Sequence, residues 1–227
     1  MLEMGDVMKI TCIAASNTKL LGENSTSVKV CHLIKEMVEN TVEAASVEVI
    51  PLMDYDITPC ILCGACYKSS SCVRDEEFNR LFSKITESDG IFLVVPHYSP
   101  IPSKLIMVFE KINEILYASW VNDPQFASPL MNIKVGVIGH GGMPEKEEAL
   151  KYYHENLVTP VANTMKSLSF QIVGLNESFP NGAVFGLKDE TCLETVDGAI
   201  FPHIVQDWAT IKERIKPLVV NMTQEIR

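Results

Sequence analysis

The chain has 227 residues and a formal net charge of −10 at pH 7, with 47% hydrophobic and 21% charged residues. This composition is that of a folded globular protein, and the negative charge argues against surfaces that bind nucleic acid or anionic membranes, which need clustered Lys and Arg. No apolar run approaches the ~18 residues that cross a bilayer, and the first residues lack the basic and apolar regions of a signal peptide. We therefore expect one cytoplasmic domain over residues 1–227, with no membrane partner.

The first predicted strand, residues 9–15, leads into a polar segment at residues 16–27. Apolar residues that follow at i, i+4, i+7 and i+8 predict an amphipathic helix, so the polar segment joins a strand to a helix. The free N–H groups and the dipole of a helix N-terminus favour a bound phosphate. Four hydroxyl side chains are placed to complete such a site: Ser16, Thr18, Ser25 and Thr26. The alternative is ordinary helix capping by Asn24 or Ser25.

A second predicted strand, residues 46–51, precedes the densest group of cysteines. Four of the seven cysteines follow the pattern Cys60-x2-Cys63-x2-Cys66-x5-Cys72, in a segment at residues 54–74 that we expect to be a loop. Four thiolates this close can surround one metal centre with little loop-closure entropy, and their spacing resembles the runs that hold cubane iron–sulfur clusters. Structural zinc and free or redox-active thiols are the alternatives, although zinc sites usually have a longer insert between two cysteine pairs.

Two buried strands are predicted further on, at residues 91–95 and 133–138, because both stretches are continuously apolar. The segments at their carboxyl ends lie where open α/β sheets bind ligands. The residues in these two segments are Pro96, His97, Tyr98 and Ser99 after one strand, and Gly139, His140, Gly141 and Gly142 after the other.

Helices complete the pattern. Asp75 is the predicted N-cap of a helix with apolar residues at 78, 81, 82 and 85. The other predictions are a helix at 103–116, a long helix from Pro144 that is divided at Pro160, a strand at 170–175, a loop at 176–201 and a C-terminal helical extension at 202–222. Five strands that alternate with helices predict an α/β fold, with a doubly wound five-stranded parallel sheet and helices on both faces.

Three of these loops and the cysteine segment resemble parts of one family, the flavodoxin-like NADPH-dependent FMN reductases, and within it the iron–sulfur flavoproteins of anaerobic microbes. The resemblance covers residues 9–175. Ala15-Ser16-Asn17-Thr18 and Gly22-x-Asn24-Ser25-Thr26 are similar to the family's phosphate loop without its proline and arginine, and Pro96-His97-Tyr98 and Gly139-His140-Gly141-Gly142 are similar to its two ring-binding segments. The family usually has a lysine and a final Asp-Arg in the next helix, where this chain has Ile106 and Glu110-Lys111.

The resemblance implies an oxidoreductase that binds FMN at the three loops and a 4Fe-4S cluster at Cys60, Cys63, Cys66 and Cys72. It also implies electron transfer with a ferredoxin-like donor or NAD(P)H, and assembly as a homodimer or homotetramer. Two other hypotheses remain. One is a cluster-free NAD(P)H-dependent FMN or quinone reductase, and the other is a non-catalytic zinc-stabilised or redox-sensing interaction protein on the same scaffold.

Overall fold

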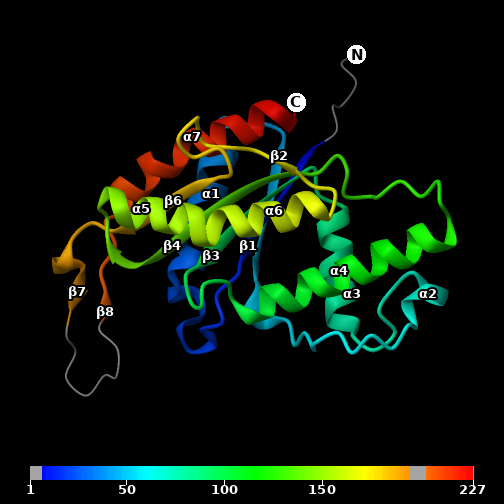
Figure 1. Ribbon diagram of the computed structural model, residues 1–227. Coiled ribbons are helices and arrows are strands. Elements are labelled where there is room, and N and C mark those ends of the chain that lie inside the picture. Colours follow the sequence, from blue (N-terminus) through cyan, green and yellow to red (C-terminus); the bar gives the residue numbers. More distant parts are fainter. Residues whose placement is uncertain (1–6, 195–202, 227) are drawn as a thin grey trace, which may run out of the picture.

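A parallel β-sheet forms the centre of the computed structural model, which describes residues 7–194 and 203–226 (Figure 1). The strand order is β2-β1-β3-β4-β5. The strands are β1 (Met8–Ala14), β2 (Ala45–Pro51), β3 (Gly90–Pro96), β4 (Lys134–Pro144) and β5 (Gln171–Ile172). This order is that of a flavodoxin-like doubly wound sheet, so the predicted fold class is confirmed.

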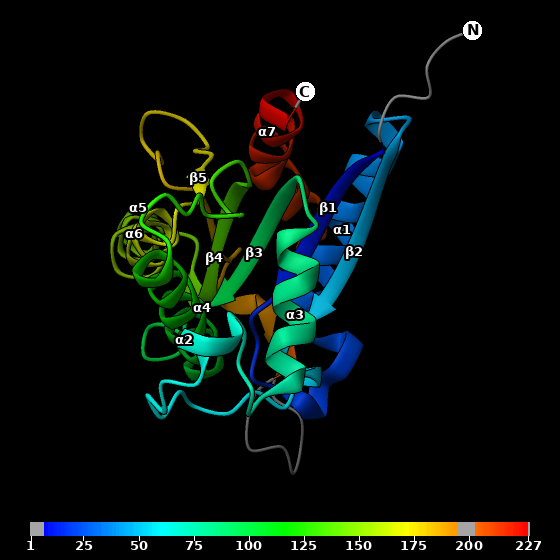
Figure 2. The same ribbon diagram turned by 90° about the vertical axis from the view of Figure 1, so that its right-hand side faces the viewer.

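Helices cover both faces of the sheet (Figure 2). One face packs against α1 (Thr26–Thr41) and α7 (Trp208–Ile226). The other face packs against α3 (Glu76–Thr86), α4 (Ser103–Asn122), α5 (Glu147–Tyr153) and α6 (Thr159–Ser167). Side chains alternate between these two cores along each strand, as in β3, where Phe92 faces the first layer and Leu93 the second. No described helix is both long and apolar enough to cross a membrane.

The fifth strand position is occupied by two short strands in turn. β5 pairs with the start of β4, and β6 (Ala183–Leu187) pairs with its second half, from Ile138↔Ala183 onward. The prediction of a loop over 176–201 was therefore wrong for 183–187, where all five residues are buried, and also for 190–194, which form a 3-10 helical turn and a short strand. Asn181 and Gly182 before the short run at 183–187, and the charged Lys188 and Asp189 after it, are residue types that indicate a loop. Residues 195–201 of the predicted loop, and residue 202 of the predicted extension, lie outside the described residues.

Beyond the sheet, the chain forms a small antiparallel pair, β7 (Leu193–Glu194) and β8 (His203–Ile204). Short 3-10 helices lie at Lys19–Asn24, Leu52–Asp54 and Glu190–Cys192. The long helix is not divided at Pro160: α5, a π-helical turn at His154–Val158 and α6 follow one another without a break, and Pro160 lies in the first turn of α6.

Two local predictions need correction. The cysteine segment is not entirely loop, because Cys66–Ser69 form one helical turn, α2. Gly139, His140, Gly141 and Gly142 do not leave the end of their strand but belong to β4, which continues to Pro144. The added pairing with β6 extends β4, and this partner strand was missing from the predicted fold. The N-cap prediction is confirmed: the Asp75 carboxylate accepts a hydrogen bond from the Phe78 N–H at 2.9 Å.

Candidate functional site

Three segments meet at the carboxyl edge of the sheet. We call residues 15–25 loop 1, residues 96–102 loop 2, and residues 139–144 the β4 end. The His97 N–H donates to the His140 carbonyl at 2.7 Å, which joins loop 2 to the β4 end. Loop 1 begins beside β3, where the Ala15 N–H donates to the Val94 carbonyl at 2.9 Å. The fold thus brings together the three segments that the sequence indicated.

Loop 1 and loop 2 are connected through one tyrosine hydroxyl. The Tyr98 hydroxyl lies 3.1 Å from Ser16 Oγ and 3.2 Å from Thr18 Oγ1, and it accepts a hydrogen bond from the Asn17 N–H at 3.3 Å. Ser16 is buried, whereas Tyr98 and Thr18 are exposed. Ser99 is exposed in the turn that follows Tyr98. The Tyr98 side chain therefore contacts two of the four hydroxyl groups of the predicted phosphate site, those of Ser16 and Thr18.

The start of α1 has the features of an anion site. Ser25 occupies the N-cap position, but its side chain makes no capping hydrogen bond. Thr26 begins the helix, and Asn24 is exposed just before it. The one nearby carboxylate in loop 1, Glu23, is 3.0 Å from the imidazole of His32. Hydroxyls, backbone N–H groups and the positive end of the helix dipole fit a phosphate group.

His140 is buried inside the fold. Its Nε2 atom is 2.8 Å from Ser27 Oγ in the first turn of α1, and its ring stacks on Phe185 of β6 with the ring centres 5.1 Å apart. Burial lowers the pKa of His140 from 6.5 to about 4, so the ring is neutral at physiological pH. His140 connects the β4 end to α1 and β6, and its backbone carbonyl connects it to loop 2.

Aromatic side chains from α5 cover the other side of the β4 end. The Tyr153 hydroxyl accepts a hydrogen bond from the Met143 N–H at 2.9 Å, and a Cβ atom on Gly141 would overlap its phenol ring. His97 Nε2 is 3.3 Å from the Tyr152 hydroxyl. Gly142 has open space where a side chain would project. A planar ring can approach the backbone at Gly142, whereas Gly141 is glycine because Tyr153 lies against it.

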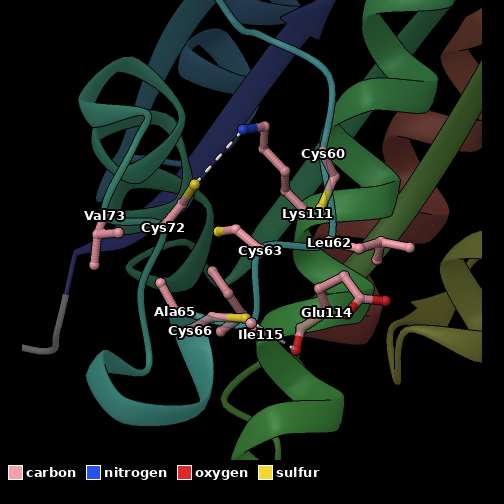
Figure 3. Close-up of a pocket in the computed structure, with 11 residues that line it drawn as sticks. Cys60, Leu62, Cys63, Ala65, Cys66, Cys72, Val73, Lys111, Glu114 and Ile115 are labelled. Atoms are coloured by element: carbon pink, nitrogen blue, oxygen red, sulfur yellow. Dashed lines mark hydrogen bonds between the residues drawn. The ribbon is translucent and has the colours of Figure 1, made fainter.

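The four cysteines of the 54–74 segment line one pocket with a volume of about 30 Å³ (Figure 3). Cys63 is exposed, and Cys60, Cys66 and Cys72 are half-buried. The Cys66 thiol approaches the Glu114 carbonyl of α4, and burial raises the pKa of this thiol. Within residues 7–194 and 203–226, no three Cys, His, Asp or Glu side chains are close enough together to hold a single metal ion.

Sequence reasoning missed a buried ion pair beside this pocket. Lys111 Nζ of α4 lies 3.0 Å from the Asp75 carboxylate and 3.6 Å from Cys72 Sγ. Burial raises the pKa of Asp75, but hydrogen bonds from the Phe78 and Thr58 N–H groups and from Lys111 outweigh it, so that the pKa is lowered. Burial lowers the pKa of Lys111, but the Asp75 carboxylate outweighs this effect and raises it. Both side chains are therefore charged.

The signal for this pair was present in the sequence. Lys111 lies between Val108, Ile112 and Ile115 on the apolar stripe of its helix, where a lysine is out of place. Its partner Asp75 lies 36 residues earlier in the chain, and its residue type and position predict only an N-cap.

Comparison with known proteins identifies the family of the chain. A family model described as NADPH-dependent FMN reductase matches residues 8–171. The chain is 28% identical over 107 residues to a protein named iron-sulfur flavoprotein from Methanosarcina thermophila. The aligned residues are 46% of this chain and 52% of that protein, so the match spans about half the length of this relative.

Solved structures share the fold at low sequence identity. RosB, solved with a bound 8-demethyl-8-formylriboflavin-5'-phosphate intermediate, superimposes with a TM-score of 0.65 at 16% identity, over 97% of this chain and 79% of RosB. An NAD(P)H:quinone oxidoreductase from Methanothermobacter marburgensis gives a TM-score of 0.55 at 14% identity, over 97% of this chain and 98% of that protein.

Proposed function

The chain belongs to the family of NADPH-dependent FMN reductases, and from this premise we propose that it is an iron–sulfur flavoprotein. The family supports the coarser part of this proposal, an FMN-dependent oxidoreductase that uses NAD(P)H. The finer proposal is that it also holds a 4Fe-4S cluster and exchanges electrons with a one-electron partner such as a ferredoxin. The observation that carries this proposal is that Cys60, Cys63, Cys66 and Cys72, from one short segment, line a single pocket.

The FMN site that we propose lies at the carboxyl edge of the sheet. FMN supplies the exchange of one or two electrons. The phosphate would lie at loop 1 and the start of α1, and the ring would lie between loop 2 and the β4 end. The proposed contacts are Ser16, Thr18, Asn24, Ser25 and Thr26 at the phosphate, and Pro96, His97, Tyr98, Ser99, His140, Gly141 and Gly142 around the ring. His140 would act through its backbone, since its imidazole is bonded to Ser27.

The cluster site that we propose is the cysteine pocket. A cubane binds each of its four thiolates to a different iron, so it requires sulfur atoms around a cavity and not four sulfurs converging on one ion. Cys60, Cys63, Cys66 and Cys72 surround the pocket in this way (Figure 3). The relative from Methanosarcina thermophila carries the name iron-sulfur flavoprotein. The chemistry of the donor set and the name of this relative support the same centre.

An apolar patch beside the cysteine segment supports the expected homo-oligomer. It consists of Tyr67, Tyr117, Trp120 and Val121. The Tyr117, Trp120 and Val121 side chains are 52%, 54% and 45% exposed, respectively. Large aromatic side chains that cluster on a surface are typical of protein interfaces. We propose that a second copy of the chain covers this patch in a homodimer or homotetramer.

The test of the function is a visible absorption spectrum of protein purified without oxygen, with iron, sulfide and FMN measured on the same sample. We expect flavin bands above a broad brown absorbance, and about four irons per chain by the stoichiometry of the cluster. The variant Cys63→Ala should lose iron and the brown absorbance and keep FMN. The matched control Cys192→Ala, which changes a cysteine outside the pocket, should keep all three.

The other outcomes separate the remaining hypotheses. Flavin without iron, with rapid bleaching by NADPH, would leave the cluster-free FMN or quinone reductase. Stoichiometric zinc without flavin would support the zinc-stabilised interaction protein. Iron that stays bound in Cys63→Ala would show that the cluster proposal is wrong about its ligands.

A further inference from the structure

A network of hydrogen bonds around a buried ion pair fastens both ends of the cysteine segment to the start of α3. At the start of the segment, the Thr58 N–H and hydroxyl donate to Asp75 Oδ2 at 2.9 and 3.0 Å. At its end, the Cys72 N–H donates to Asn79 Oδ1 at 3.0 Å, and the Asn79 side-chain amide donates to the Cys72 carbonyl at 2.7 Å. Lys111 joins the two ends, because its ammonium reaches both Asp75 and Cys72 Sγ.

The ion pair in this network is removed from water. The Lys111 and Asp75 side chains are 4% and 2% exposed. The ammonium also lies 5.7 Å from the centre of the Phe78 ring and 3.5 Å from Thr58 Oγ1. Charges interact far more strongly in such surroundings than at a surface, because the local dielectric constant is lower and salt screens less.

Stability alone gives a weak reason for a charged pair at this place. A buried ion pair adds little net stability compared with apolar side chains of similar size, because both ions lose their hydration. The rest of the buried stripe of α4 is apolar, including Val108, Ile112 and Ile115. What distinguishes Lys111 from these neighbours is its contact with a cysteine sulfur, shown by the dashed line to Cys72 in Figure 3.

We propose that Lys111 and Asp75 are positioning residues that hold Cys72 and set the reduction potential of the metal centre bound by the four cysteines. The inference rests on the proposed function, since it concerns the cluster. Hydrogen bonds to the sulfurs, net local charge and exposure are the means by which a protein sets this potential. The ammonium at 3.6 Å from Cys72 Sγ favours the reduced, more negative cluster, and the carboxylate opposes it.

The two substitutions therefore have opposite effects. Lys111→Met leaves the carboxylate without its cation, so the cluster becomes harder to reduce and its potential falls. Asp75→Asn leaves the ammonium uncompensated beside the sulfur, so the potential rises. A purely structural role would loosen the segment in both variants and would not produce shifts of opposite sign.

The experiment is an anaerobic redox titration of the iron-loaded protein, followed by the electron paramagnetic resonance signal of the reduced cluster. Iron per chain is measured on every sample. Lys104→Met is the matched control, because Lys104 is half-buried on the same helix and donates to the Tyr55 carbonyl at 2.7 Å. Its cluster potential should equal that of the wild type.

Each outcome has a clear reading. A lower potential in Lys111→Met and a higher one in Asp75→Asn, at wild-type iron content, support the inference. Removing one partner of a buried pair strongly destabilises a protein, so the double variant Lys111→Met/Asp75→Asn provides a folded comparison. The reduction potential of its cluster should lie below that of the wild type and above that of Lys111→Met. A wild-type potential in the double variant, or shifts of the same sign in the single variants, would overturn the inference alone. Wild-type protein without iron would overturn the proposed function together with it.

Discussion

Acid should destabilise this protein through His140, and the size of the effect follows from its burial. The unfolded chain binds a proton at this imidazole below pH 6.5, whereas the folded chain does so only near pH 4. Stability from this group is therefore fully present above pH 6.5 and is lost as the pH falls toward 4. The full loss is about 3 kcal/mol, and about 2 kcal/mol is already lost at pH 5.

The assay is urea unfolding of FMN-free wild type and His140→Gln at pH 7.5, 6 and 5. Glutamine keeps a hydrogen-bonding group for Ser27 Oγ but does not titrate. The stability advantage of the wild type over the variant should shrink by about 2 kcal/mol between pH 7.5 and 5. Burial also lowers the pKa of His154, but this effect is common to both proteins and cancels in the difference. An advantage that is independent of pH would refute the reasoning.

Three further predictions concern the loops and the patch. Gly141→Ala should lower the free energy of unfolding in urea by about 1–3 kcal/mol, because its Cβ meets the buried Tyr153 ring. Gly142→Ala meets open space and should change this free energy by less than about 0.5 kcal/mol. Equal losses in the two variants would contradict this reasoning. Tyr98→Phe removes the hydroxyl that joins loop 1 to loop 2 and should weaken FMN binding about fivefold in a fluorescence titration, with Tyr117→Phe as the unaffected control. Trp120→Glu should reduce the molar mass measured by light scattering to that of a monomer, and an unchanged mass would exclude the patch as the interface.

Much of the fold was predictable because its strands and helices obey simple periodicities. Residues 91–95 could hardly be anything but a buried strand, and Asp75 had the residue type and position of an N-cap. β6 was missed because Gly186 interrupts its apolar run, whereas residues 91–95 form an uninterrupted run of large apolar side chains. The prediction also ended the preceding strand at residue 138, whereas β4 continues because Gly139 and His140 pair with β3 on one side and with β6 on the other.

The candidate site was predictable in its segments and not in its side-chain contacts. Residue types and spacing indicated which loops would meet, and the parallel order of the strands places them together. Residue types and spacing do not indicate which side chains of these segments point into the fold. His140 faces Ser27 and Phe185, and Lys111 reaches Cys72 across 39 positions in the chain, which is a tertiary contact that no local pattern encodes.

The unequal support of the three ligand-facing segments has an entropic consequence. At the β4 end, Gly139 and His140 pair with both β3 and β6, and Pro144 pairs again with β6, so this backbone is fixed by the sheet itself. Loop 1 has no strand partner along residues 17–24, and its Leu20 side chain is fully exposed. Ordering a free segment costs conformational entropy that ordering a ladder does not. For a ligand that spans both segments, we therefore expect most of the entropic cost of ordering the backbone to arise in loop 1 and little of it at the β4 end.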